Sequence, residues 1–371
     1  MSITITADFD GGNIEVLSGQ GGAWDLAIRP DHNSHYYQWF YFRVDGAAGV
    51  DLTLRLTNAG GSAYTGGWEN YRARVSTDNA DWLCADTSYE NGVLTIRHRT
   101  DADTLWFAYF APFDSQRHRA FVAQVKTLPG MAHRVLGQTL DGRDLDLFTL
   151  GDGPAKVWLY ARQHPGETMA EWWMEGAIAF LPGSDPAAQH LRQAATFYIV
   201  LNMNPDGSAR GHLRTNAAGV DLNREWGGPT MERSPEIVYV LDAMQKSGVD
   251  FAIDVHGDEA IPHVFMAGFE GTPSWSEARA ALYQSYLDRL MARTADFQTT
   301  YGYDIPGPGA ANLAISTNAV AERFTAIAMT LEMPFKDHDD APEPVRAWSP
   351  DRSRKLGETC LLALADIVEA L

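Results

Sequence analysis

The first hundred or so residues alternate between apolar and polar positions. The segment 50–56 reads Val-Asp-Leu-Thr-Leu-Arg-Leu, and the turn-forming run Asn-Ala-Gly-Gly follows it at 58–61. Because successive side chains of a strand point to opposite faces, this period of two indicates strands with one face in a core. The pattern extends from Asp8 to about Phe110 and predicts an antiparallel β-sandwich. The aromatic-rich run 36–42 within it predicts sheet core and a contact with a second domain.

The pattern changes after about Pro112, where short apolar runs begin to alternate with helical patterns. The runs occupy 157–160, 197–201, 251–255 and 326–331. This alternation is typical of βαβ units around a mainly parallel sheet.

Helix starts follow from local sequence. Ser-Pro-Glu at 234–236 and Ser-Pro-Asp at 349–351 each combine a capping serine, a proline suited to the first helical position and an acid that favours the helix dipole. The second start predicts a terminal helix that runs to about Leu371. We therefore predict two domains, an antiparallel β-sandwich over residues 1–112 and an α/β domain over 113–371 whose mixed, mainly parallel sheet is flanked by helices.

Charge and cysteine content narrow the classes of function. The chain has 371 residues, with 29 Lys and Arg against 48 Asp and Glu, which gives a net charge of −19. This charge repels phosphate backbones and anionic membranes, so we expect neither nucleic acid nor membrane as a partner. Two cysteines, Cys84 and Cys360, are too few for a disulfide scaffold, and neither lies at metal-ligand spacing from the other. The sequence does not indicate an oligomeric state.

The N-terminal segment and the apolar runs bear on location. The segment Met-Ser-Ile-Thr-Ile-Thr-Ala-Asp-Phe-Asp has no basic region and no sustained apolar stretch, so it does not resemble a secretory signal. Apolar runs elsewhere are shorter than the roughly 18 residues of a membrane span. We expect a cytoplasmic protein.

Chemically reactive groups follow the predicted parallel strands. His164 and Glu167 follow the first run, His256 follows the third, and Glu332 comes directly after the fourth. Ligand crevices of open α/β sheets lie at the carboxyl ends of strands, so we expect these groups to converge. Two imidazoles and one carboxylate, with a fourth position left for water, form a common catalytic zinc set.

The loop 211–226 adds candidate recognition groups. It contains Arg214, Asp221, Asn223 and Arg224 among glycines. Arginine is suited to bidentate capture of a carboxylate or an oxyanion. Alone, these residues would be solvated loop charges, whereas beside a zinc site they would recognise substrate.

Five motifs together resemble the zinc carboxypeptidase family, specifically its cytosolic branch, in which a β-sandwich precedes the catalytic domain. In the family's order, the motifs are His-Pro-Gly-Glu at 164–167, Asn-Pro-Asp-Gly at 204–207, Arg214 with Gly-Val-Asp-Leu-Asn-Arg at 219–224, Asp-Val-His-Gly at 254–257 and Thr-Leu-Glu at 330–332. They cover roughly residues 110 to 340, and the aromatic-rich first third is similar to the extra domain of the cytosolic branch.

The resemblance implies a role for each matching residue. It implies that one zinc ion per chain is held by His164, Glu167 and His256. It also implies that Glu332 is the general base and acid and that Arg214 polarises the scissile carbonyl.

Further roles concern the substrate's end and the zinc ligands. The resemblance implies that Asn223 and Arg224 hold the substrate's terminal carboxylate, while Asp221 orients His164 from behind. The implied partner is the C-terminus of a peptide or protein.

The sequence departs from the family in one respect. Members usually have a mobile tyrosine some 20 residues before the catalytic glutamate, but the span from Asp304 to Leu331 contains no tyrosine. Either Tyr301 or Tyr303 reaches the site through a longer loop, or the role is absent. The Gly- and Pro-rich segment 305–311 is predicted to be a loop that rims the pocket.

Three functions remain open. The first is hydrolysis of C-terminal amino acids from peptides or protein tails by zinc-activated water. The second is deacylation of N-acyl amino acids, because enzymes of the aspartoacylase and succinylglutamate desuccinylase type look similar around the zinc ligands. The third is a catalytically silent, zinc-containing binding protein. The leading β-sandwich and the Asn-Pro-Asp-Gly element favour the first function.

Overall fold

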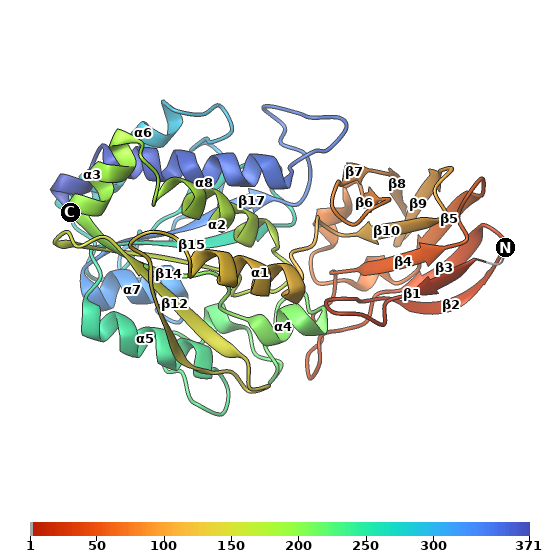
Figure 1. The fold of residues 1–371 in the computed structure, drawn as a ribbon, viewed down its shortest axis with the longest axis horizontal. Helices are drawn as coiled ribbons and strands as arrows, with labels where there is room; N and C mark the ends of the chain where they lie inside the picture. The colour runs from red at the N-terminus through yellow and green to blue at the C-terminus, as the bar shows by residue number, and fades with distance from the viewer. Residues whose placement is uncertain (1–2) are drawn as a thin grey trace.

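The computed structural model describes residues 3–371 and has two parts (Figure 1). An all-β part at one end is formed by the N-terminal third of the chain, and an α/β part at the other end contains the C-terminus. This arrangement confirms the fold class predicted from the sequence.

The N-terminal part is a sandwich of two five-stranded sheets. The first sheet has the order β1 (Thr4–Thr6), β4 (Tyr41–Asp45), β10 (Thr104–Ala108), β6 (Arg74–Ser76) and β7 (Leu83–Cys84). The second sheet has the order β2 (Glu15–Gln20), β3 (Ala23–Ala27), β5 (Asp51–Leu56), β9 (Val93–Arg99) and β8 (Asp86–Glu90). Leu52, Leu54 and Leu56 of β5 are buried while Asp51 and Arg55 are exposed, as the alternation predicts.

One strand pair departs from the antiparallel prediction. Strands β3 and β5 run parallel, with Trp24 opposite Leu54. After β3 the chain crosses to the other sheet, forms β4 there, and returns for β5. This crossover allows the two strands to enter the sheet in the same direction.

The aromatic run 36–42 is only partly a strand. Strand β4 begins at Tyr41, and the residues before it have no ladder partners. The Gln38 side chain instead makes two hydrogen bonds to the backbone of Tyr64. Its Oε1 accepts from the Tyr64 amide at 2.8 Å, and its Nε2 donates to the Tyr64 carbonyl oxygen at 3.0 Å. Trp39, Phe40, Tyr41 and Phe42 are buried, as predicted for core residues, whereas Tyr36 and Tyr37 are only partly buried.

The C-terminal part is built on a seven-stranded mixed sheet. Its order is β11 (Ala132–Gln138), β12 (Asp144–Leu150), β14 (Ala195–Val200), β13 (Ala155–Ala161), β15 (Phe251–Asp258), β17 (Ile327–Pro334) and β16 (Phe265–Ala267). The four predicted apolar runs form β13, β14, β15 and β17, which are mutually parallel. The flanking strands β12 and β16 pair antiparallel with this group.

Helices cover both faces of this sheet (Figure 1). One face carries α2 (Met169–Phe180), α3 (Pro186–Ala194), α6 (Glu277–Met291) and α8 (Pro350–Ala365). The other carries α5 (Pro235–Ser247) and α7 (Ser316–Phe324), while α1 (Ser115–Val125) and α4 (Pro205–Arg210) lie toward the sandwich. Short 3₁₀ helices are η1 (Ala59–Gly61), η2 (Thr65–Trp68), η3 (Leu222–Arg224) and η4 (Val368–Ala370).

Helices α2 and α8 pack closely because glycines line their contact. A Cβ at Gly176 would lie 1.9 Å from the carbonyl oxygen of Arg354, and one at Gly357 would lie 2.3 Å from that of Trp173. Ser349 caps α8 as predicted, since its side chain accepts from the amide of Arg352. The predicted terminal helix ends earlier than expected, at Ala365, and η4 follows it.

Buried polar contacts join the two parts. The Arg74 guanidinium of β6 is buried and donates to the carbonyl oxygens of Phe335 at 2.9 Å and Trp348 at 3.3 Å. The rings of Tyr109 and Phe335 stack with centroids 4.5 Å apart. Strand β10 ends at Ala108 and α1 begins at Ser115, and the domain boundary at 112 stays a prediction. No helix within residues 3–371 has the length and apolarity to cross a membrane.

One buried carboxyl group makes the stability of the fold depend on pH. Glu236, in the first turn of α5, is fully buried, and its Oε2 accepts from Asn216 Nδ2 at 3.4 Å. Its Oε1 has no hydrogen-bond partner within residues 3–371. Burial raises the pKa of Glu236 to about 7, because a charged carboxylate is poorly solvated there.

We expect Glu236→Gln to stabilise the protein at pH 8 and to have little effect at pH 5. A raised folded-state pKa favours folding at low pH, and this contribution is lost as pH rises from the unfolded value of about 4.5 toward 7. The gain at pH 8 should be on the order of 2 kcal/mol. Thermal unfolding of both proteins at the two pH values measures it, and an equal effect at pH 5 and 8 would contradict this account.

Candidate metal centre and active site

The turn between β13 and α2 presents His164 and Glu167. The amide of Gly166 donates to the carbonyl oxygen of Leu213 at 2.8 Å, and a Cβ at Gly166 would lie 2.9 Å from that oxygen. Glycine is therefore required for this close approach. Buried Arg162 supports the turn by donating to the carbonyl oxygens of Pro165 at 3.1 Å and Phe113 at 2.9 Å.

Three potential metal ligands converge here. His164 and Glu167 come from the turn, and His256 comes from β15. His164 Nδ1 lies 2.7 Å from Glu167 Oε1, and His256 Nδ1 lies 2.7 Å from Glu167 Oε2. The two Nδ1 atoms are 3.1 Å apart, and all three residues are buried. Two imidazole nitrogens at this distance can share a proton or bind one metal ion.

The donor set fits zinc. Ligands at about 2.0–2.1 Å in a tetrahedral shell lie roughly 3.3 Å from one another. The observed separations of 2.7–3.1 Å are close to that value. Two imidazole nitrogens and one carboxylate also match the ligand types of catalytic zinc sites.

Each imidazole is held from behind by a carboxylate. His164 Nε2 lies 3.0 Å from Asp221 Oδ1, and His256 Nε2 lies 2.9 Å from Asp254 Oδ1. The hydrogen bond to Asp221 fixes the tautomer of His164 and turns its inner nitrogen toward a metal, whereas Asp254 Oδ1 is an ion-pair neighbour of His256 and has no hydrogen-bond partner within residues 3–371. The sequence interpretation identified Asp221 but gave Asp254 no role. Its position two residues before His256 on a strand places both on one face, which could have indicated the pairing.

The charges of this cluster shift its pKa values. Burial alone would raise the pKa of Glu167, but the neighbouring His164 and His256 hold it well below its usual range. The pKa of Asp221 is also well below normal, because His164 and Arg214 outweigh the effect of burial. Both carboxyl groups are therefore ionised.

Glu332 lies on β17, directly opposite His256 of β15 in the sheet register. Its Oε1 accepts from the Tyr303 hydroxyl at 3.1 Å, whereas its buried Oε2 has no hydrogen-bond partner within residues 3–371. Burial raises the pKa of Glu332 well above its usual range. The charge of His256 lowers this pKa, whereas the negative charges of Glu167 and Asp258 raise it further. A carboxylate in such surroundings has a strong tendency to take up a proton.

Of the two candidate tyrosines, Tyr303 is the one at the site. Its hydroxyl lies 2.7 Å from Asp258 Oδ2 as well as 3.1 Å from Glu332 Oε1. Tyr301 instead stacks on His263, with ring centroids 4.4 Å apart. The predicted loop 305–311 contains no helix or strand, and it is exposed except at Ala311.

Arg214 lies between the two parts of the protein. Its Nε donates to Asp221 Oδ2 at 2.8 Å, and its guanidinium lies 5.5 Å from the ring centroids of Tyr36 and Tyr64 in the sandwich. Burial alone would lower the pKa of Arg214, but the Asp221 charge raises it above the usual value. Arg214 thus remains a cation beside the carboxylate that holds His164.

Asn223 and Arg224 form the short helix η3 next to these groups. Asn223 is buried, and its Oδ1 accepts from the amide of Ser316 at 2.9 Å. This hydrogen bond fixes the orientation of the side-chain amide, so that the donor Nδ2 points away from Ser316. Arg224 is exposed, and its Nη1 donates to the carbonyl oxygen of Asn223 at 2.8 Å. Both residues follow Asp221, which contacts His164 and Arg214.

A second histidine group is a poor metal site. His263, His338 and Asp340 also bring potential ligand atoms together. However, His338 uses both ring nitrogens, since Nε2 donates to the carbonyl oxygen of Asp296 at 2.6 Å and Nδ1 accepts from the amide of Asp340 at 3.2 Å. We interpret this group as an anchor for the neighbouring loops.

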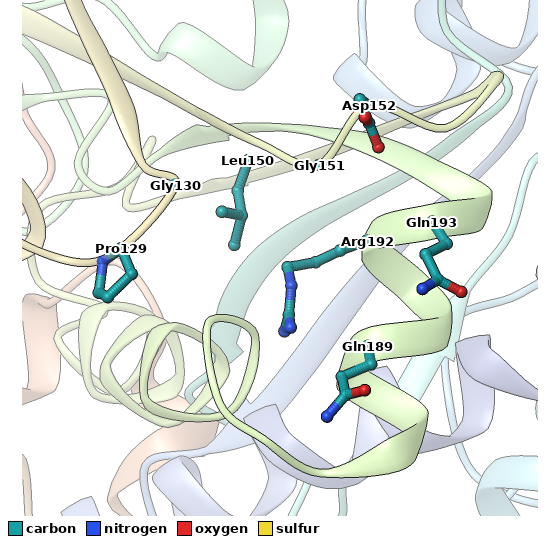
Figure 2. Close-up of a pocket in the computed structure, with 8 residues that line it drawn as sticks. All are labelled: Pro129, Gly130, Leu150, Gly151, Asp152, Gln189, Arg192 and Gln193. Carbon is teal, nitrogen blue, oxygen red and sulfur yellow. The ribbon is translucent and has the colours of Figure 1, made fainter.

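The cavity drawn in Figure 2 is separate from the site. Leu150, Gly151 and Asp152 line it and precede β13, whereas His164 follows the other end of that strand. Arg192 extends toward the middle of the cavity, where it donates to the carbonyl oxygen of Gly183 at 3.0 Å. The cavity thus lies at the amino end of β13, whereas His164 and Glu167 lie beyond its carboxyl end.

Comparison with known families agrees with this geometry. The family described as "Zinc carboxypeptidase" matches residues 119–337, and the chain belongs to that family. Residues 5–110 match the family described as "Cytosolic carboxypeptidase N-terminal domain". Both findings confirm the resemblance stated from the motifs.

Individual relatives are also similar in sequence. An uncharacterized protein of Zymomonas mobilis is 52% identical over 100% of this chain and 98% of its own length. Human cytosolic carboxypeptidase 1 is 28% identical over 72% of this chain, and the match spans 26% of that longer protein.

Solved structures match over the whole chain. A metallo-carboxypeptidase from Burkholderia cenocepacia has 40% identity and a TM-score of 0.97, with 100% of each chain covered. A metallo-carboxypeptidase from Pseudomonas aeruginosa, solved with (2-guanidinoethylmercapto)succinic acid, has 44% identity and a TM-score of 0.96, with 99% of each chain covered.

We expect His164→Ala and His256→Ala to lose zinc, because each removes one of three ligands. The parent protein should hold about one ion per chain. His263→Ala is the matched control, since it alters the second histidine group and should keep its zinc. Elemental analysis of the purified proteins measures the content, and full zinc in both ligand variants would contradict the assignment.

Proposed function

We propose that this protein is a zinc-dependent metallocarboxypeptidase that removes C-terminal amino acids from peptides or protein tails. The observation that supports this most is the buried set of His164, Glu167 and His256 with Glu332 on the adjacent strand. Membership of the zinc carboxypeptidase family supports peptidase chemistry. We also propose a cytoplasmic location, because relatives are named cytosolic carboxypeptidases.

Each residue has a defined part in this reaction. A zinc ion bound by His164, Glu167 and His256 would polarise the scissile carbonyl and acidify a water molecule. Glu332 accepts the proton of the attacking water on its unpaired Oε2 and delivers it to the leaving amine.

The cationic side chains stabilise and orient the substrate. Arg214 stabilises negative charge that develops on the carbonyl oxygen. Asn223 Nδ2 and the Arg224 guanidinium bind the terminal carboxylate. The Pseudomonas aeruginosa relative was solved with a succinic acid derivative, a ligand with carboxylates, and this supports carboxylate recognition in the present chain.

Activity against a panel of substrates tests the proposal. Peptides with free C-termini should be shortened by one residue at a time, whereas N-acyl amino acids should be hydrolysed far more slowly. Preference for the acyl amino acids would favour the deacylase alternative. Full zinc occupancy without turnover of either class would favour a binding protein.

We expect Glu332→Gln to lower kcat by roughly 100- to 10,000-fold with little change in KM, because the amide cannot accept a proton. Zinc content should stay near that of the parent. Glu236→Gln, which alters a buried glutamate outside the site, is the matched control and should keep its kcat. A near-normal kcat with a lowered thermal midpoint would instead assign Glu332 a structural role.

We expect Arg224→Ala to raise KM by about tenfold or more for peptides with a free C-terminus, since a charged hydrogen bond contributes about 1.5–3 kcal/mol. For the same peptides with amidated C-termini, parent and variant should perform alike. Arg233→Ala removes a nearby exposed arginine that pairs with Glu225 at 3.1 Å, and it serves as the control. Equal losses on both kinds of peptide would contradict carboxylate binding.

A further inference from the structure

A carboxylate from the sandwich holds the backbone of the loop that contains Arg214. Asp31 is buried, and its Oδ1 accepts from the amide of Leu213 at 2.7 Å. Its Oδ2 accepts from the amide of Arg214 at 2.8 Å, the amide of Thr215 at 2.9 Å and the hydroxyl of Thr215 at 3.1 Å. Three consecutive backbone amides of one part of the protein are thus satisfied by one side chain of the other.

A second contact supports the same segment. The amide of His32 donates to His212 Nε2 at 3.0 Å, so the ring proton lies on Nδ1, which donates to the carbonyl oxygen of Thr215 at 2.9 Å. Asn13 Nδ2 donates to the carbonyl oxygen of Gly211 at 3.1 Å. The sandwich therefore binds the loop on both sides of Arg214.

The rest of the loop is held differently. The amides of Ala218 and Val220 donate to the side chain of Asn216 at 3.0 and 3.1 Å, and the amide of Asn216 donates to the carbonyl oxygen of Val220 at 3.0 Å. Those bonds fix residues 216–220 within the loop itself. Residues 213–215 depend on Asp31, because buried amides must find an acceptor.

The held segment leads directly to the metal ligands. The carbonyl oxygen of Leu213 accepts from Gly166 in the turn of His164 and Glu167. The Arg214 side chain binds Asp221, which in turn binds His164. A displaced backbone at Arg214 would thus move its guanidinium relative to the site.

We propose that Asp31 is a positioning residue for catalysis, which fixes the Arg214 backbone so that its guanidinium faces the reacting carbonyl. The proposal rests on the proposed peptidase function. It gives the N-terminal sandwich a part in the reaction, although Asp31 itself touches neither substrate nor metal. A carboxylate is required because it alone offers enough acceptor sites for four converging donors.

The variant Asp31→Asn tests this, because its amide keeps the shape but turns an NH₂ group toward backbone donors. We expect kcat/KM to fall by at least about tenfold. The loss should stay below the roughly 100- to 1,000-fold effect of removing an oxyanion donor outright. Asp10→Asn is the matched control. Asp10 is another sandwich carboxylate, and it accepts from the amide of Ser115 at 2.8 Å, away from Arg214.

A double-mutant cycle separates positioning from general stability. In an Arg214→Ala background, Asp31→Asn should cause little further loss, because the group that it positions is gone. A purely structural role would cause the same fold-loss in both backgrounds. Equal losses there, or an unchanged kcat/KM of the single variant, would overturn the proposal. If Asp31→Asn does not fold, Thr215→Val removes one of the four donors and should give a smaller loss that Arg214→Ala again abolishes.

Hydrogen exchange supplies a readout that is independent of activity. The amides of residues 213–215 should exchange at least about tenfold faster in Asp31→Asn than in the parent or Asp10→Asn. Unchanged exchange would overturn the proposal even if the peptidase is active. A parent protein that cleaves no peptide would instead overturn the proposed function, and exchange would still decide whether Asp31 holds the loop.

Discussion

The structure depends on holding two imidazole nitrogens 3.1 Å apart beside a carboxylate in a buried site. Such an arrangement is favourable only when a proton or a metal ion lies between the nitrogens, because unpaired polar groups are costly in a buried site. Carboxylates therefore surround it, with Asp221 behind His164 and Asp254 behind His256. The parallel strands β13 and β15 lie side by side, so their carboxyl ends lie next to each other. The two paired strands supply the rigidity that the cluster requires.

Much of this could be predicted from the sequence because it follows from local patterns. The apolar runs predicted the central strands, and the positions of His164, Glu167 and His256 after those runs predicted that these groups would converge. The β3–β5 parallel pair could not be predicted, since the crossover that creates it depends on which sheet β4 joins. The choice between Tyr301 and Tyr303 was also beyond the sequence, because the stacking of Tyr301 on His263 is a tertiary contact. Asp31 gave no local pattern, since its partners begin 182 residues later.

The sandwich and the α/β part are joined by contacts of two kinds. Around Phe335 the contact is structural, with the buried Arg74 guanidinium on backbone carbonyls and Tyr109 stacked on the ring. Around Arg214 the contact involves charged groups, with Asp31 on the backbone and Tyr36 and Tyr64 beside the guanidinium. The first kind fixes the orientation of the two parts, and the second uses that orientation to complete the site.

The long sequence separation between Asp31 and Leu213 has a consequence for biogenesis. During synthesis an N-terminal domain is complete before the chain that follows it. The sandwich is thus present as a template when the loop 211–226 leaves the ribosome, and the amides of residues 213–215 find their acceptor only by docking on it. A nascent chain whose sandwich is misfolded would retain His164, Glu167 and His256 without a properly placed Arg214. Correct folding of the sandwich is thereby a condition for the final position of Arg214.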